Sequence, residues 1–405
     1  MLNKLANLLY AVMLAFASNS AIAKNNELAI AVLSADHAQI AAYTTWFNRF
    51  ELSNPDITLK VDFYSDESYK KQLDSWLQSG SYDLLYWQAG SRLKRLVKNG
   101  WLQPVSSILD TSEISRAIPR GIINELSFNN DLLAIPFSQY AWGIYYNIEI
   151  FQELDLSPPR SWEELISLCV HLKQQNIMPF IQTTHENWPV LAWMDYVTLI
   201  VGGRELRNKV ANGQKLTNEE QKSLVSLMKP LLENDYLLAP TYDWTWQQTL
   251  PTIMRKQAAM TLTGQFAESI IAPQWSSKIG FFPFPEMKEM DIEMTPMEVF
   301  VVPKSSTKQK LISNFLRYLL RPSVQKNLAL DLGWLPVNLQ VLDDASISSR
   351  KQIINTQLKT VQQRIQYFDR DADPDIAELL AQSLITSIRE RNISPFAEVL
   401  ASFNN

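Results

Sequence analysis

The sequence predicts an α/β fold in which a parallel sheet is covered by helices on both faces. Strand and helix patterns alternate three times between residues 27 and 98, and this alternation is typical of parallel sheets. The chain of 405 residues is long enough for two or three domain-sized units. The first 23 residues have the features of a secretory leader, so we expect the folded protein to begin near residue 24.

The expected leader, residues 1–23, combines a basic start, an apolar run and a small-residue cleavage site. Lys4 precedes the apolar run "LLYAVMLAFA", and Ala21-Ile22-Ala23 follows as the cleavage pattern. The run is shorter than the roughly 20 apolar residues that a membrane-spanning helix needs. The leader contains no Cys for lipid attachment. We therefore expect a mature protein that is free in the periplasm.

The charge and cysteine content exclude several classes of function. Removal of Lys4 with the leader changes the formal net charge from −5 to −6, and the chain has no basic block. This composition argues against a nucleic-acid partner. The single cysteine, Cys169, cannot form an internal disulfide and shares an apolar helical face with Trp162 and Leu165. We interpret it as a buried core residue.

The first third of the chain reads as three successive strand–helix units. Strands are expected at 27–34, 57–64 and 83–86, and helices at 38–53, at 69–77 and from Leu93 onward. The third strand leads into Trp87-Gln88-Ala89-Gly90, which reads as a tight exit. Ligands of parallel sheets bind beyond the carboxyl ends of the strands, and Asp36, Trp87 and Gln88 lie at such ends.

The rest of the chain alternates between extended and helical regions. Residues 132–147 form a long aromatic-rich extended segment that Pro136 should break, and Ser161 with Glu164 predicts the start of a helix through a capping box. Residues 187–250 read as mostly helical. Further segments are extended at 258–266, 278–285, 298–306 and 333–338, and helical at 309–322 and after residue 350.

Several blocks of this sequence carry a family likeness. They are "DLLYWQAGSRLKRLVKNGWLQPV", "LAIPFSQYAWGIYYN" followed by "PPRSWEEL", "QAAMTLTGQF" with "KIGFFPFP", and "LRPSVQKNLALDLGWLPVN". In this order and behind a leader, they resemble the extracellular solute-binding proteins of ABC sugar importers (family 1), the group that includes maltose-binding protein. The resemblance covers residues 83 to about 338.

The resemblance implies the type II periplasmic-binding-protein fold: two lobes, each a mixed sheet flanked by helices, with a ligand cleft between them. The chain would cross between the lobes near 136–141, near 264–266 and near Trp334. We therefore expect lobe 1 to comprise 24–137 and 266–330, and lobe 2 to comprise 138–265 and 331–405. The expected mechanism is closure of the lobes on the ligand.

The resemblance also implies a carbohydrate ligand and an ABC permease in the inner membrane as the docking partner, with the receptor acting as a monomer. Two alternatives stay open. The same receptor could signal through a membrane sensor, or it could carry a glycerol-phosphate-type ligand, which would want Arg or Lys in the cleft. The residues proposed for the cleft from the sequence include no Arg and no Lys.

Aromatic and amide side chains suit a sugar, because rings cover the C–H faces of a pyranose and planar polar groups pair with its hydroxyls. Trp87 and Gln88 supply both kinds at a strand end. Gln139 and Tyr140 lie at the first crossing, where the resemblance implies ligand contacts, and Trp142 is either a contact or a hinge-packing residue.

The remaining candidates lie near other crossings, in loops or among aromatic residues. Trp244 and Trp246 are two residues apart, the separation that puts side chains on one side of an extended segment. The others are Asp36, Trp188, Asp195, Gln265, Glu298 and Trp334. For the aromatic members, packing in the core is the competing interpretation.

The sequence offers no pattern of an enzyme, a cofactor site or a metal site. It has no Gly-x-Ser-x-Gly elbow, no His-Glu-x-x-His and no phosphate-binding glycine loop. A glycosidase would require two acids about 5–10 Å apart across the cleft. The run "DRDADPD" (369–375) departs from a calcium loop at its Gly and Glu positions. Asp373 as N-cap with Pro374 at the first helical position explains it better.

Overall fold

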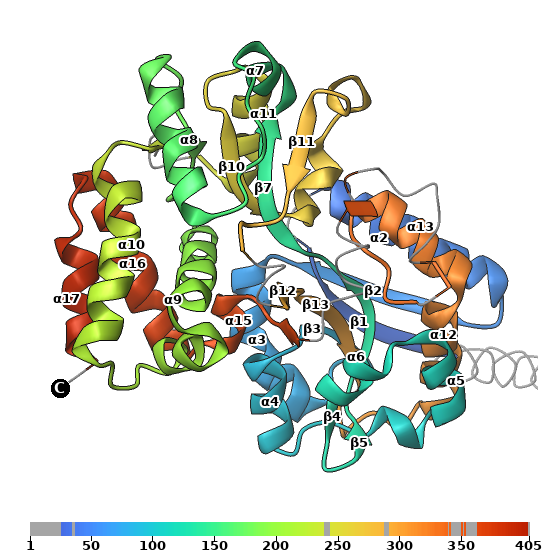
Figure 1. The fold of residues 1–405 in the computed structure, drawn as a ribbon. Helices are drawn as coiled ribbons and strands as arrows, with labels where there is room; N and C mark the ends of the chain where they lie inside the picture. The colour runs from blue at the N-terminus through green and yellow to red at the C-terminus, as the bar shows by residue number, and fades with distance from the viewer. Residues whose placement is uncertain are drawn as a thin grey trace, which may run out of the picture.

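The computed structural model describes residues 26–34, 37–238, 244–286, 291–338, 340–341, 350, 352–353 and 363–403. The expected leader and Asp36 lie outside the described residues. The fold is two-lobed and α/β, with one five-stranded sheet in each lobe (Figure 1). None of the described helices combines the length and the hydrophobicity that a membrane span requires.

The sheet of the first lobe is mixed. β1 is parallel to both of its neighbours, whereas β13 is antiparallel to β3 and to β6. The strand order is β2 (Thr58–Tyr64), β1 (Glu27–Leu33), β3 (Leu84–Gln88), β13 (Met297–Val301) and β6 (Ile135–Gln139). Every residue of β3, β13 and β6 is buried, as expected for strands that helices cover on both faces.

The sheet of the second lobe is also mixed. β7 is antiparallel to β11 and β10, and β8 is parallel to β10 and β9. The order is β11 (Ile279–Phe282), β7 (Trp142–Asn147), β10 (Met260–Gly264), β8 (Phe180–Ile181) and β9 (Leu237–Leu238). Two small pairs complete the strands: β4 (Ser127–Phe128) with β5 (Asp131–Leu132), and β12 (Ile292–Met294) with β14 (Gln363–Ile365).

Helices flank both sheets. Those of the first half are α2 (His37–Ser53), α3 (Asp66–Ser79), α4 (Ser91–Lys98), α5 (Thr111–Ala117), α6 (Arg120–Glu125), α7 (Ile148–Glu153), α8 (Trp162–Gln174) and α9 (Leu191–Ala211). The others are α10 (Asn218–Glu233), α11 (Thr249–Met254), α12 (Gln309–Leu320), α13 (Pro322–Leu332), α15 (Phe368–Asp371), α16 (Pro374–Glu390) and α17 (Ser394–Ser402). The described part of the chain also contains the short 3₁₀ turns η1 (Val105–Ser107), η2 (Trp188–Val190), η3 (Trp246–Gln248), η4 (Gln265–Ile270) and η5 (Pro273–Trp275).

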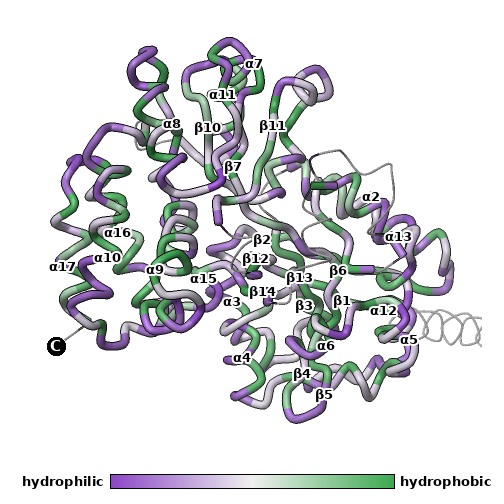
Figure 2. Tube along the Cα trace, in the orientation of Figure 1, coloured by the Kyte–Doolittle hydropathy of each residue, from purple (hydrophilic) through white to green (hydrophobic). Residues whose placement is uncertain are grey.

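Helical periodicity decides which faces are buried. In α2 the residues Tyr43, Trp46, Phe47 and Phe50 recur at helical intervals and are all buried. The ring of Trp46 stacks on that of Phe137 of β6 at 6.1 Å, so this face covers the sheet. The coloured tube shows the same division, with hydrophobic residues along the strands and hydrophilic ones on the outer turns (Figure 2).

The boundaries of two predicted elements differ from the sequence prediction. β3 continues through Trp87 and Gln88, which the sequence assigned to a tight exit, and the turn comes at Gly90. Pro136 does not break the segment 132–147, because it lies inside β6, an edge strand whose ladder tolerates a residue without an N–H. The break falls at Tyr140–Ala141, between the two sheets.

The predicted return to lobe 1 at residue 266 needs correction. β11 lies within the range assigned to lobe 1, yet Ile279 pairs with Asn147 and places this strand in the second sheet. The chain rejoins the first sheet only at Met297 of β13. The pairing partner of a short apolar strand is a long-range property, and the sequence pattern of 278–285 does not carry it. The two-lobe division by residue range otherwise stays a proposal.

Two predicted helix starts are confirmed by their caps. The Ser161 hydroxyl accepts from the Glu164 N–H at 3.2 Å, and the Glu164 carboxylate accepts from the Arg160 N–H at 2.7 Å. The Asp373 carboxylate accepts from the Asp375 N–H at 3.0 Å, with Pro374 at the first helical position of α16. The acidic run at 369–375 therefore contains a helix start, as the sequence predicts.

Asp83 fixes the position of β3 in the first sheet. Its carboxylate accepts hydrogen bonds from the Ala29 N–H at 2.9 Å, the Ser306 hydroxyl at 3.1 Å and the Lys308 ammonium at 3.0 Å. We predict that Asp83→Ala lowers the free energy of unfolding by about 2–3 kcal/mol, because these donors lose a buried acceptor. Urea denaturation followed by tryptophan fluorescence measures the free energy of unfolding. Asp83→Asn, which keeps an acceptor oxygen, serves as the control, and an equal loss in both variants would contradict this explanation.

Candidate functional site

Three polar side chains form a row across the first sheet, on the strands nearest the crossing. Glu298 of β13 pairs in register with Gln88 of β3 on one side and with Ser138 of β6 on the other. Residues that face each other across neighbouring strands project to the same side of a sheet. All three are buried. We call Gln88, Glu298 and Ser138 the polar row.

Arg370 of α15 connects the polar row to the crossing. Its guanidinium donates to the Glu298 carboxylate at 2.6 Å, to the Tyr140 hydroxyl at 2.7 Å and to the Met297 carbonyl at 3.3 Å. The side chains of Arg370 and Glu298 are only 8% and 3% exposed, so this is a buried ion pair. The other Glu298 oxygen, Oε2, is buried and has no partner within the described part of the chain.

Seven aromatic rings gather beside this pair. Trp142 and Tyr367 stack with centroids 4.4 Å apart and planes 1° from parallel, and Trp188 meets Trp142 edge-on at 5.9 Å. Phe266 lies at the centre of the cluster, 4.7 Å from Trp246 and 5.3 Å from Tyr140. The aromatic group comprises Tyr140, Trp142, Trp188, Trp246, Phe266, Trp334 and Tyr367. Five of these were candidates from the sequence.

Several buried polar atoms around the crossing have no partner within the described residues, although others, such as Trp46 Nε1 and the Tyr196 hydroxyl, lie elsewhere in the two lobes. Those around the crossing include Ser138 Oγ and Glu298 Oε2 of the polar row, and the indole N–H groups of Trp142 and Trp334. Gln265 Nε2 is another, although Gln265 Oε1 accepts from the Ala141 N–H at 3.2 Å. An unpaired buried polar atom costs roughly 1–3 kcal/mol, so several of them in one place are expected where a ligand supplies the partners.

Trp87 does not join this arrangement. It follows Tyr86 and precedes Gln88 in β3, and alternate residues of a strand project to opposite faces. Its ring stacks on Tyr69 of α3 at 5.9 Å, with planes 21° apart. The structure therefore places Trp87 under a helix, which is the core-packing interpretation, while Gln88 lies in the polar row.

Trp244 and Trp246 lie on either side of Thr245, which is extended and caps the 3₁₀ turn η3 through a reciprocal capping box with Gln248. The extended conformation ends there, because Trp246 is the first residue of the turn, and a shared stacking surface of the two rings stays a prediction. Trp246 is buried in the aromatic group. Trp244 is half-buried, and its carbonyl accepts from the Thr183 hydroxyl at 2.7 Å.

Two other candidates make internal contacts. The amide of Gln139 donates to the Pro336 carbonyl at 2.9 Å and accepts from Arg364 at 2.9 Å, so its polar atoms serve the crossing itself. Asp195 is fully buried in α9, where its carboxylate accepts from Arg207 Nε at 2.6 Å and from the Phe368 N–H at 2.7 Å. Asp195 is connected to the site through the Phe368 N–H and through Arg207, which also donates to the Gln366 carbonyl at 2.7 Å.

The ion pair of α9 depends on a break in that helix. Asp195 and Arg207 are twelve residues apart, which corresponds to roughly 18 Å along a straight helix. The backbone leaves helical geometry at Gly202 and Gly203, and Gly203 has φ of +62°. A residue with this φ is normally glycine. The break folds the last turns of α9 back, so that Arg207 reaches Asp195.

The sequence interpretation missed the arginines of the site. Arg370 pairs with Glu298, and Arg92 of α4 donates to the Gln88 side chain and to the Asp369 carboxylate, the latter at 2.7 Å. The signal was the run "YFDRD" at 367–371, in which aromatic and charged residues are interleaved. From the sequence alone, the acids of this run suggest only metal ligands or a helix start. Among the described residues, no group of three or more His, Cys, Asp or Glu side chains forms a metal site.

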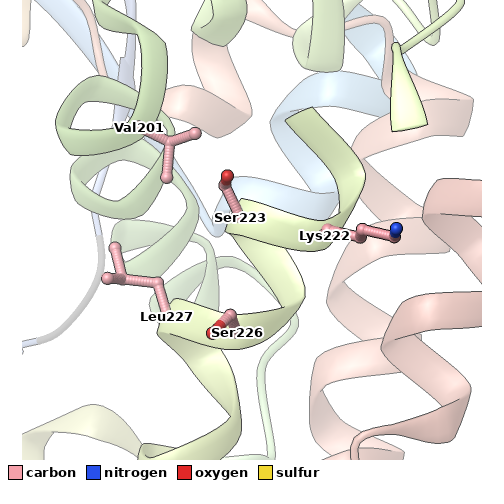
Figure 3. Close-up of a pocket in the computed structure, with 5 residues that line it drawn as sticks. All are labelled: Val201, Lys222, Ser223, Ser226 and Leu227. Atoms are coloured by element: carbon pink, nitrogen blue, oxygen red, sulfur yellow. The ribbon is translucent and has the colours of Figure 1, made fainter. Parts of the chain in front are cut away.

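A surface hollow of about 460 Å³ lies away from this site, between α9 and α10. It is lined by Val201, Lys222, Ser223, Ser226 and Leu227. Figure 3 shows Val201 of α9 facing Ser223 and Leu227 of α10. No residue proposed from the sequence lines this hollow. The candidate ligand site is therefore the region of the polar row and the aromatic group.

Comparison with known proteins establishes the family. Residues 45–355 match the model of the family described as bacterial extracellular solute-binding protein, and the chain belongs to this family. It is 24% identical over 290 residues to an uncharacterized ABC transporter extracellular-binding protein of Pyrococcus horikoshii, covering 69% of this chain and 64% of that protein. It is 26% identical over 172 residues to the multiple sugar-binding protein of Streptococcus mutans, covering 41% of each.

Solved structures show the same fold. The bacterial solute receptor AcbH, described as having an exclusive preference for β-D-galactopyranose, superimposes with a TM-score of 0.83 at 19% identity. The match covers 94% of this chain and 98% of that one. The binding protein RafE in complex with raffinose gives a TM-score of 0.76 at 18% identity, covering 94% and 100%. The family and the fold are those of binding proteins.

The first prediction for this site concerns the Arg370–Glu298 pair. Arg370→Met leaves the Glu298 carboxylate buried without its cation, and we expect the ligand-free protein to lose roughly 3–5 kcal/mol of unfolding free energy. Adding Glu298→Gln to this variant removes the uncompensated charge and should restore part of the loss. Denaturant titrations of the two variants and of Glu298→Gln alone complete a double-mutant cycle. Additive effects of the two substitutions would show that the pair is not coupled.

The second prediction concerns Glu125 of α6, whose carboxylate accepts from Gln366 Nε2 at 2.6 Å. Burial raises the pKa of Glu125 to about 7, and nearby Asp371 adds to this rise, whereas the Gln366 hydrogen bond and the charges of Arg364 and Arg204 oppose it. The folded protein thus holds a proton that the unfolded chain releases near its ordinary pKa of about 4.3. The stability that protonation of Glu125 contributes is fully present below pH of about 4.3, and it is lost as the pH rises through the folded-state pKa of about 7.

We therefore expect unfolding free energies measured from pH 5 to pH 7.5 to fall more steeply for the wild type than for Glu125→Gln. The difference should total at most about 3 kcal/mol. Glu293, whose pKa burial raises to about 8, contributes equally to both proteins and cancels in the comparison. Parallel curves for the two proteins would contradict the assignment.

Proposed function

We propose that this protein is the solute receptor of an ABC-type importer and that it captures a carbohydrate between its two lobes for delivery to a membrane permease. The family membership and the fold support the receptor role. The matches cover 64% and 66% of the two Pyrococcus proteins, so the partner and the ligand are part of the proposal. The membership in the extracellular solute-binding family and the leader pattern of residues 1–23 support a location in the periplasm. We also propose that the protein is a monomer and has no catalytic activity.

The arrangement around Arg370 carries the ligand assignment. This one guanidinium contacts both Glu298 of the polar row and Tyr140 of the aromatic group, so hydrogen-bonding groups and ring faces are adjacent. A sugar ring presents the same two surfaces, C–H faces and hydroxyl rims. The unpaired atoms include both donors (the Trp142 and Trp334 N–H groups) and an acceptor (Glu298 Oε2), which suits hydroxyls, since each hydroxyl can donate and accept.

A phosphorylated polyol is the second candidate, because the structure puts Arg370 and Arg92 at the site. Both guanidiniums are already paired with carboxylates, Arg370 with Glu298 at 2.6 Å and Arg92 with Asp369 at 2.7 Å. A phosphate would have to displace one of these carboxylates or accept the remaining N–H groups next to a negative charge. This charge balance favours a neutral ligand.

A thermal-shift panel tests the proposal on the mature protein, with mono-, di- and trisaccharides and glycerol 3-phosphate. A ligand that binds only the folded form stabilises it by about 2.7 kcal/mol at a hundred times its dissociation constant. We expect a rise in melting temperature with one class of sugar. A rise with glycerol 3-phosphate alone would replace the carbohydrate with the phosphorylated ligand, and no rise with any compound would contradict the ligand assignment.

Ser138→Ala sharpens the test, because the Ser138 hydroxyl is buried and finds no hydrogen-bond partner among the described residues. Its removal should leave the ligand-free melting temperature unchanged or raised, and should weaken sugar binding by roughly tenfold, the equivalent of about 1.4 kcal/mol. Ser383→Ala is the matched control, since Ser383 is also buried but donates to the Leu380 carbonyl within α16 at 2.8 Å. Isothermal titration of both variants compares them. Equal affinities would remove Ser138 from the site.

A further inference from the structure

Next to the polar row, the same face of the first sheet carries aromatic side chains. Tyr86 of β3 lies two residues before Gln88, so both side chains project to this face. The partner of Tyr86 in register is Phe300 of β13, just as Glu298 is the partner of Gln88. The rings of Tyr86 and Phe300 meet edge-on at 6.3 Å. The polar row is therefore followed, one step further into the sheet, by an aromatic layer.

Tyr43 of α2 covers this aromatic layer. Its ring meets the ring of Phe137 edge-on at 6.5 Å, and the Phe137 ring lies 5.6 Å from that of Tyr86. The Tyr43 ring also meets the ring of Trp334 edge-on at 6.3 Å. Tyr43 is 0% exposed and Trp334 is 4% exposed. The side chain of Tyr43 is therefore enclosed between α2, the first sheet and the third crossing.

The Glu298 carboxylate lies near the hydroxyl groups of Tyr43 and Tyr86. Burial raises the pKa of Tyr43, and the charge of Glu298 raises it further. The same two causes, in the same order, raise the pKa of Tyr86. Glu298 Oε1 accepts from Arg370, which also donates to the Tyr140 hydroxyl. The second carboxylate oxygen, Oε2, is therefore the atom left to take a partner.

Three buried polar atoms of these side chains have no hydrogen-bond partner within the described part of the chain: the Tyr43 hydroxyl, Glu298 Oε2 and the Trp334 indole N–H. A carboxylate oxygen only accepts, an indole N–H only donates, and a phenol does either. A water molecule or an alcohol can pair with all of them, and buried waters make about three hydrogen bonds. A cation would leave the indole N–H unpaired, and an anion would lie against the Glu298 charge. These atoms therefore suit a neutral hydroxyl.

We infer that Tyr43, Glu298 and Trp334 form a subsite for one hydroxyl group at the first-lobe end of the ligand site. Water occupies this subsite in the ligand-free protein, and a hydroxyl of the captured carbohydrate replaces the water in the complex. The hydroxyl donates to Glu298 Oε2 and accepts from Tyr43 or Trp334. Only the second occupant rests on the proposed function. Tyr43, a packing residue of α2, thereby also selects sugars with a free hydroxyl at this position.

A high-resolution crystal structure of the ligand-free mature protein tests the subsite without any sugar. We expect one ordered oxygen at hydrogen-bonding distance, about 2.5–3.0 Å, from both the Tyr43 hydroxyl and Glu298 Oε2. A direct hydrogen bond from the hydroxyl of Tyr43 or Tyr86 to Glu298 Oε2, with no oxygen between them, would overturn the subsite. This measurement does not depend on which solute the protein captures.

Tyr43→Phe tests the replacement of the water by a sugar hydroxyl, because it keeps the ring and removes only the hydroxyl. Isothermal titration with galactose, maltose and raffinose should show about tenfold weaker binding than in the wild type. Tyr196→Phe is the matched control. The Tyr196 hydroxyl is also buried without a partner among the described residues, but it belongs to α9 of the second lobe, where its ring stacks on Phe284 at 3.8 Å. This control should bind sugar as the wild type does.

The outcomes separate the subsite from the ligand assignment. Equal affinities of Tyr43→Phe and Tyr196→Phe would overturn the replacement of the water by the sugar. Sugar binding by the wild type, together with a ligand-free crystal that has no bridging oxygen, would overturn the subsite and leave the proposed function intact. A bridging oxygen in a protein that binds no sugar would overturn the ligand assignment alone.

Discussion

The buried ion pair between Arg370 and Glu298 is the contact on which the arrangement of the site depends. It joins a turn near the end of the chain to a strand of the first sheet, and the same guanidinium reaches Tyr140 at the crossing. Removing two charges from water is costly, and only a close, well hydrogen-bonded geometry offsets that cost. Such a pair tolerates few alternative placements. It therefore fixes the aromatic group beside the polar row, which is the combination a polyhydroxylated ring requires.

The second lobe provides the support for this pair. Asp195 and Arg207 hold Gln366 and Phe368 against α9, and they reach each other because Gly202 and Gly203 interrupt the helix. The supporting shell is thus built from charged residues that would not be expected on the buried face of a helix. These charged residues keep Gln366 and Phe368 in place. Arg370 follows Phe368 in the chain, and its guanidinium reaches Glu298 of the first sheet. Ligand sites need this kind of second layer to hold their polar groups within hydrogen-bonding distance.

The sequence predicted most of the elements correctly because periodicity and caps are local. The strands and helices of residues 27–98 and the N-caps Ser161 and Asp373 follow from patterns a few residues long, whereas the change of sheet near Tyr140 was an expectation from the family resemblance. The site was predicted in part. Trp142, Trp188, Trp246 and Trp334 do converge, but Trp87 packs under α3 because its neighbours in β3 alternate across the sheet. The arginines were missed, since their role comes from carboxylates 72 and 277 residues away.

By itself, the sequence determined the α/β class, the order of strands and helices, and a stock of aromatic and amide side chains near the chain crossings, because these depend on the chemistry of neighbouring residues. Only the tertiary structure decided that β11 belongs to the second sheet, which face of β3 meets the site, and that the run at 367–371 contacts both lobes. These outcomes depend on pairings between distant segments, where burial and charge balance select one partner among many that local patterns allow.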